Sequence, residues 1–146
     1  MLSVSNAEKY IDEFSVEHIR GDRFGKALSR FIAKKGIHQS ELCSMTGIMP
    51  STVSKYISDD NIRPDMRIII AICIALRLSY EQSCYLLSLK HYCLSDTSPE
   101  DVMLHMFLSS CLYVSDITVI WCNNKLIEHG YKPLTGLKKV QKKDVN

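Results

Sequence analysis

One stretch of nineteen residues constrains the fold more than any other part of the chain: residues 39–57 read QSELCSMTGIMPSTVSKYI. Leu42 and Cys43 share one face of a short helical pattern, and Gly47 then supplies the backbone freedom that a sharp turn requires. Pro50 opens a second helix, because its fixed φ and missing N–H do no harm at a first helical position. The stretch therefore predicts two short helices that cross closely, with the small Cys43 at the crossing.

The second of these helices has an apolar and a polar face. Val53, Ile57 and part of Tyr56 lie on the side expected to be buried. The opposite side carries small hydroxyl groups and one cation, from Ser51, Thr52, Ser54 and Lys55. Hydroxyl groups can bond base edges or phosphates, and a lysine can pair with guanine or phosphate oxygens. This face suits a helix that enters the major groove of DNA.

From Phe24 to Leu78, 55 of the 146 residues, the chain resembles the lambda-repressor-like helix-turn-helix domains, also called Cro or XRE type. The resemblance runs without a gap through KKGIHQSEL, a small residue, TGI, STVSKYI, the pair Arg63-Pro64 and an apolar helix closing with IALRLS. It implies an all-α fold: a lambda-repressor-like five-helix DNA-binding domain with an N-terminal helix and a C-terminal helical extension. More weakly, residues 87–136 are similar to the C-terminal portion of small bacterial regulators of this family, which ends in a motif like EHGYKPLTG.

The resemblance also implies a role for individual residues. Gln39 matches the position that bonds a backbone phosphate, and residues 61–63 match a loop that lies along the phosphates. Ser51, Thr52 and Lys55, together with the position of Pro50, are expected to face the bases. The complete predicted DNA-binding set is Gln39, Pro50, Ser51, Thr52, Ser54, Lys55, Asn61 and Arg63.

Three positions depart from the family pattern. Met49 stands where a capping Ser or Thr is usual, and losing such a cap typically costs about 1 kcal/mol. Pro50 stands where many members have a polar base-reading residue, which leaves more of the specificity to Lys55 and to DNA shape. His38 replaces the usual Thr, so Glu41 is expected to form only half of a capping box.

Composition agrees with an ordinary globular protein and places no part of the chain in a membrane. Hydrophobic residues make up 46% and charged residues 23% of the chain. The longest apolar run, Ile68–Leu76, has nine residues, whereas a membrane span needs roughly 20. No signal peptide is recognisable, so a cytoplasmic location is expected. The six cysteines lack CxxC spacing and are expected to be reduced, mostly buried thiols.

Positive charge gathers on the segment that carries the motif. The net charge of the chain is only +2, but residues 21–78 carry nine cations against five anions. Residues 79–136 carry three cations against six anions, and residues 137–146 carry four against one. This uneven distribution favours an anionic partner for the motif and for the basic tail.

Helical patterns divide the chain into four parts. These are an N-terminal helix at 1–21, a DNA-binding domain at 22–94, a helical extension at 95–136 and a disordered basic tail at 137–146. Apart from the motif, helices are expected over 22–36, after a cap at Asp65, from Ser79 to about Tyr92, from Ser98, and from about Ser115 to His129.

The two helices of the extension are apolar around most of their circumference, so something must cover them. The preceding helices can do so, or a second copy of the chain can. Because dimers on palindromic sites multiply affinity and specificity, we expect a homodimer that acts as a transcriptional repressor on double-stranded DNA. The alternative is an antitoxin-like or adaptor protein whose C-terminal helices bind a protein partner, with weak or autoregulatory DNA binding.

Other classes of function find little support in the sequence. There is no phosphate-cradling glycine loop, no HExxH motif and no nucleophile elbow, so no enzyme and no catalytic residue are expected. Cys84, His91 and Cys93 lie near one another, with His105 and Cys111 further on, but they form no four-ligand pattern. We therefore expect no metal and no other cofactor.

Overall fold

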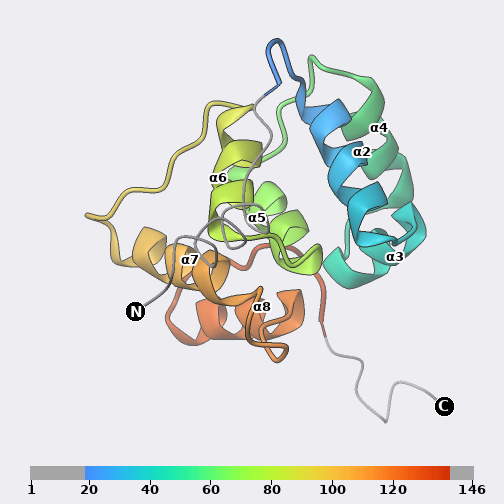
Figure 1. Ribbon diagram of the computed structural model, residues 1–146. Helices are drawn as coiled ribbons and strands as arrows, with labels where there is room; N and C mark the ends of the chain where they lie inside the picture. Colours follow the sequence, from blue (N-terminus) through green and yellow to red (C-terminus); the bar gives the residue numbers. More distant parts are fainter. Residues whose placement is uncertain (1–18, 139–146) are drawn as a thin grey trace, which may run out of the picture.

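The computed structural model describes residues 19–138, and throughout that part of the chain the regular elements are helices (Figure 1). They are α2 (Phe24–Lys35), α3 (Gln39–Thr46), α4 (Pro50–Ser58), α5 (Met66–Ala75), α6 (Tyr80–Ser88), α7 (Pro99–Ser110) and α8 (Val119–Glu128). The predicted all-α fold is confirmed. The helix predicted over the first residues and most of the basic tail lie outside the described residues.

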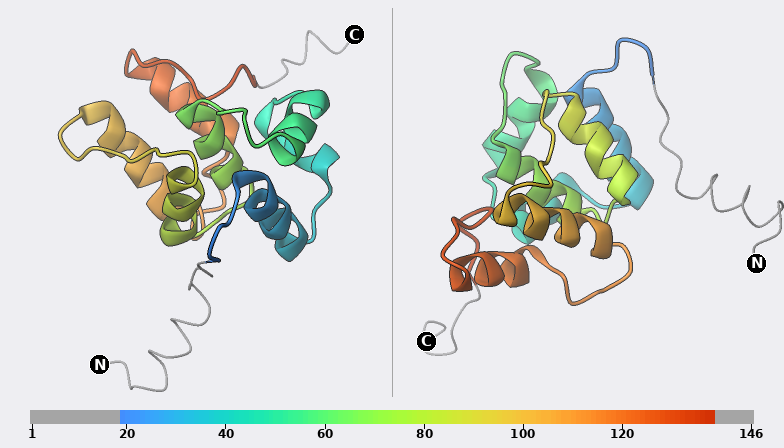
Figure 2. Two further views of the ribbon diagram at one scale, coloured as in Figure 1. Left: turned by 90° about the horizontal axis from the view of Figure 1, so that it is seen from above. Right: turned by 90° about the vertical axis from the view of Figure 1, so that its left-hand side faces the viewer.

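Helix α5 lies at the centre of the molecule. Its residues Ile69–Ile74 are all at most 1% exposed. Helices α3, α6, α7 and α8 pack against it, while α2 packs across α4. The views in Figures 1 and 2 place α2, α3 and α4 on one side of α5 and place α7 and α8 on another. An apolar helix without a polar face requires this kind of all-round cover.

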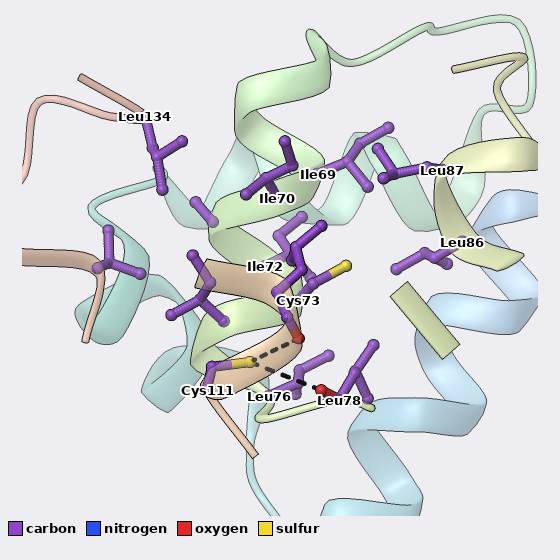
Figure 3. Packing of buried hydrophobic residues seen from close by; sticks show 14 of the residues in the cluster. Ile69, Ile70, Ile72, Cys73, Leu76, Leu78, Leu86, Leu87, Cys111 and Leu134 are labelled. Atoms are coloured by element: carbon purple, nitrogen blue, oxygen red, sulfur yellow. Dashed lines mark hydrogen bonds between the residues drawn. The ribbon is translucent and has the colours of Figure 1, made fainter. Parts of the chain in front are cut away.

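A single core connects the motif with the C-terminal extension. Buried side chains from Phe24 in α2 to Leu134 beyond α8 belong to one cluster. Figure 3 shows α5 side chains between Leu86 and Leu87 of α6 and Leu134 of the C-terminal segment. The boundary predicted between residues 94 and 95 therefore crosses a continuous core, and the division into domains stays a prediction.

The buried cysteines behave as apolar core residues. Cys111 at the end of α7 is fully buried, and its Sγ donates to the backbone oxygens of Leu78 at 3.6 Å and Leu108 at 3.8 Å (Figure 3). Burial raises the pKa of the Cys73 and Cys122 thiols to about 12. These thiols stay protonated at neutral pH and are poor nucleophiles.

Side-chain caps fix the start of several helices where the sequence predicted them. Asp65 Oδ1 accepts a hydrogen bond from the backbone N–H of Arg67 at 2.9 Å and opens α5. Ser79 Oγ accepts from the N–H of Gln82 at 3.1 Å, and Gln82 Oε1 accepts in return from the N–H of Ser79 at 2.9 Å. The capping box predicted for α6 is therefore present.

Two predicted helix ends are wrong. Helix α6 ends at Ser88 rather than near Tyr92, because His91 has a φ of 62° and the Tyr92 N–H turns back to the Leu87 oxygen at 3.1 Å. Helix α8 begins at Val119 rather than near Ser115. The Thr118 Oγ1 accepts from the N–H of Trp121 at 3.2 Å and so caps the helix three residues later than predicted.

A buried carboxylate ties the start of α2 to α6. The Asp22 side chain is 2% exposed and accepts from Arg30 Nη1 at 2.9 Å and Nη2 at 2.5 Å. The Tyr85 hydroxyl also donates to it at 2.5 Å, and the Arg23 N–H donates at 2.9 Å. The bonds from Arg30, more than the others, lower the pKa of Asp22 to about 2 from its ordinary 3.8. Folding therefore favours the charged form of this carboxyl group.

We predict that Asp22→Asn lowers the free energy of unfolding at pH 7 by about 2 kcal/mol, since one pKa unit corresponds to about 1.4 kcal/mol. Because the folded-state pKa lies below the unfolded value, the stabilisation is complete above pH 3.8 and is lost as the pH falls toward about 2. Denaturant unfolding at several pH values measures it, with the exposed Asp96→Asn as the control. An Asp22→Asn protein with the acid sensitivity of the wild type would contradict the assignment.

Candidate nucleic-acid interface

Helix α4 crosses α2 at close range, and this crossing fixes its position. A Cβ atom on Gly25 would lie 2.1 Å from the backbone oxygen of Ile57, so only glycine allows this approach. Val53, in the middle of α4, is fully buried. Sequence reasoning missed Gly25, although a glycine between the apolar residues at the start of a predicted helix is a signal of close packing.

The turn between α3 and α4 is held by a buried hydroxyl. Thr46 is fully buried, and its Oγ1 donates to the Leu42 oxygen at 2.7 Å and accepts from the Ile48 N–H at 3.2 Å. Gly47 follows with a φ of 81°, in the left-handed region that favours glycine, as the sequence predicted. Cys43 is 8% exposed, which agrees with its predicted place where the two helices cross.

The outer side of α4 carries the side chains that the sequence singled out. Ser51, Ser54 and Lys55 are exposed, and Thr52 is partly buried. Pro50 is the first residue of the helix, and Met49 before it is 67% exposed and supplies no side-chain cap. Three polar groups and one cation therefore share a solvent-facing surface.

The start of α3 lies at the surface as well. Gln39 is its first residue and is exposed. Glu41 Oε1 accepts from the His38 N–H at 3.2 Å, so the Glu41 side of the predicted capping box is present. The Gln39 side chain is thus available to an outside partner.

The loop after α4 is held from behind by the turn that ends α6. Arg63 Nε donates to the Lys90 oxygen at 2.9 Å, and its guanidinium lies 4.0 Å from the centre of the Tyr92 ring. Lys90 Nζ donates to the Asp60 oxygen at 2.8 Å, and the Tyr92 hydroxyl donates to the Pro64 oxygen at 2.8 Å. We call Arg63, Lys90 and Tyr92 the clasp. These contacts fix the path of residues 60–64.

Asn61 and Arg63 are both exposed, but their groups have different hydrogen-bond partners. Asn61 is exposed, and its N–H donates to Asp59 Oδ1 at 3.0 Å, so its side chain faces solvent in a defined turn. Arg63 instead directs its guanidinium at Lys90 and Tyr92. A phosphate contact by Arg63 stays a prediction, but its clasp contacts are a role that the sequence did not suggest.

Between residues 19 and 138, no group of three or more His, Cys, Asp and Glu side chains could hold a metal ion. Across the same residues, no helix is both long and apolar enough to cross a membrane.

The arrangement defines a helix-turn-helix protein: a short helix, a left-handed glycine turn and a second helix with an exposed polar face. Residues 27–82 match the family model of the Cro/C1-type helix-turn-helix DNA-binding domain. This segment therefore belongs to the lambda-repressor-like Cro/XRE family, as the sequence motif indicated, and it is a DNA-binding domain. No curated protein and no solved structure matched the chain.

For the clasp, we predict that Arg63→Ala and Arg63→Lys both lower the free energy of unfolding by about 1–2 kcal/mol. Lysine keeps the charge but has no planar guanidinium to stack on Tyr92 and no Nε–H for the Lys90 oxygen. Denaturant unfolding measures the effect, and Lys26→Ala, an exposed cation on α2, is the control. Full stability of Arg63→Lys would show that charge alone matters at this position.

Proposed function

We propose that the protein is a transcriptional regulator that binds double-stranded DNA, with α4 in the major groove. One observation carries the proposal: α4 exposes Ser51, Ser54 and Lys55 while Gly25 and Val53 hold its other side immobile. A helix with fixed backbone can present short side chains to base edges in a defined register.

The proposed contacts fall into two groups. Ser51, Thr52 and Lys55, beside Pro50, read bases from the first two turns of α4, with Ser54 at the edge of the same surface. Gln39 and Asn61 contact phosphates of the DNA backbone. Arg63 contacts a phosphate only through the guanidinium N–H groups that are not bonded within the clasp. Phosphate contacts set the orientation of the domain, and the base contacts give sequence preference.

We predict that the double variant Ser51→Ala with Lys55→Ala binds short duplex DNA at least tenfold more weakly than the wild type. A good side-chain contact to a base is worth about 1–3 kcal/mol. Fluorescence anisotropy at two salt concentrations measures the affinity. The control is Lys125→Ala on α8, because that cation pairs with Glu128 at 3.2 Å and lies away from α4.

Salt-insensitive binding that is unchanged by the double variant would reject the DNA-reading surface. Weakening by Lys125→Ala to the same extent would show a general charge effect instead.

We further propose that the protein acts as a homodimer on a palindromic site and represses transcription by occupying the promoter. The support is the set of large apolar side chains that α7 and α8 leave exposed. Met106 is 61% exposed and Val102, one turn before it on α7, is 41% exposed. Ile127 on α8 is 53% exposed. Solvent-exposed apolar side chains of this size are common at protein interfaces.

Helices α7 and α8 meet through an aromatic contact. The Trp121 ring of α8 lies edge-on to the Phe107 ring of α7, with ring centres 5.7 Å apart. Both helices also pack against α5, so the core holds the apolar side chains that they present to a second subunit. The same surface also fits a different protein partner, as an antitoxin-like or adaptor protein would require, and the mass of the purified protein in solution distinguishes the two.

We predict that the wild type is a dimer at micromolar concentration and that Met106→Asp makes it a monomer, because a charge at the centre of an apolar interface loses its hydration. Sedimentation velocity measures the mass. Ser29→Asp, which adds the same charge at an exposed position of α2, should leave the dimer intact. A wild type that is monomeric throughout would refute the dimer and favour the partner hypothesis.

A further inference from the structure

We propose that residues 134–138, which we call the strap, are part of the DNA interface: Asn123 positions the strap, and Lys138 contacts a backbone phosphate. The inference rests on the proposed DNA-binding function and adds a contact to it from outside the helix-turn-helix segment.

Asn123 on α8 holds the strap with both ends of its amide group. Its Oδ1 accepts from the backbone N–H of Leu134 at 2.8 Å and of Thr135 at 3.3 Å. Its Nδ2 is within hydrogen-bonding distance of the Thr135 oxygen at 3.2 Å, the Thr135 Oγ1 at 3.3 Å and the Leu137 oxygen at 3.1 Å. Asn123 is only 2% exposed, so these bonds are shielded from water. This one side chain fixes the backbone path of three strap residues.

The strap leads from the core to the turn of the helix-turn-helix. Leu134 is 3% exposed and anchors the start of the strap in the core. At the other end, a Cβ atom on Gly47 would lie 2.8 Å from the Cβ of Leu137 and 3.2 Å from its Cα. Figure 1 shows this red end of the described chain passing beside α3. Gly47 precedes the first residue of α4 by only three positions, so Lys138 emerges next to the start of the proposed recognition helix.

The charge of the strap suits a phosphate. Lys138 is exposed and forms no ion pair with any residue in the range 19–138. Residues 79–136 carry three cations against six anions, whereas Lys138 is the first cation of the basic segment 137–146, with four cations against one anion. A lysine ammonium near the DNA backbone displaces a condensed counterion, and this displacement makes binding depend on salt.

Duplex DNA binding over a series of salt concentrations tests the inference. We expect Lys138→Gln to weaken binding several-fold and to reduce the slope of log K against log salt by about 0.9, the value for one phosphate contact. Lys125→Gln, which removes the same charge from α8, is expected to change neither quantity. A Lys138→Gln slope equal to that of the wild type overturns the phosphate contact.

Asn123→Ala tests the positioning role separately. We expect faster hydrogen exchange at the Leu134 and Thr135 amides, which donate to Asn123, together with the slope reduction seen for Lys138→Gln. Unchanged exchange at these amides overturns the role of Asn123 as the group that holds the strap. Since Lys138 is exposed, its variant stays informative even if Asn123→Ala fails to fold.

The outcomes also separate this inference from the proposed function. If the double variant Ser51→Ala with Lys55→Ala weakens binding and Lys138→Gln does not, only the strap contact is wrong. If the wild type does not bind duplex DNA at any salt concentration, both proposals are overturned.

Discussion

The rest of the structure depends on the complete burial of α5. Six successive residues of this helix, Ile69–Ile74, have almost no exposed surface, so each of its sides needs a partner. The helix-turn-helix segment covers part of it through α3, and the remaining sides are covered by α6, α7 and α8. The C-terminal extension is therefore part of the same core as the DNA-binding segment, because without it an apolar helix would face water.

Much of the fold follows from local signals. The apolar spacing over 24–32, the left-handed Gly47, the proline at the start of α4 and the caps at Asp65 and Ser79 each depend on a few neighbouring residues. Such features can be predicted from spacing alone. The two wrong helix ends are also local, but the apolar pattern continued past the point where the backbone turned, at His91, or began before the cap at Thr118.

The remaining features depend on which distant residues meet. Gly25 is required by the Ile57 oxygen, and Arg63 is held by Lys90, although nothing near either residue in the sequence reveals the partner. The exposed residues of α4 could be predicted because side chains return to the same face of a helix at a known spacing. The path of the loop beside it could not, since a long side chain such as Arg63 can turn toward a phosphate or toward its own protein.

The contact between Trp121 and Phe107 has a practical consequence for studying cooperativity. Trp121 is the single tryptophan of the chain and sits where α7 meets α8, so fluorescence excited at a wavelength that the seven tyrosines do not absorb reports on the extension. Circular dichroism at 222 nm sums over all the helices. Coincident unfolding curves from the two signals would mean that the extension and the helix-turn-helix melt as one unit. Separate curves would mean that α5 stays folded against its other partners after α7 and α8 have unfolded.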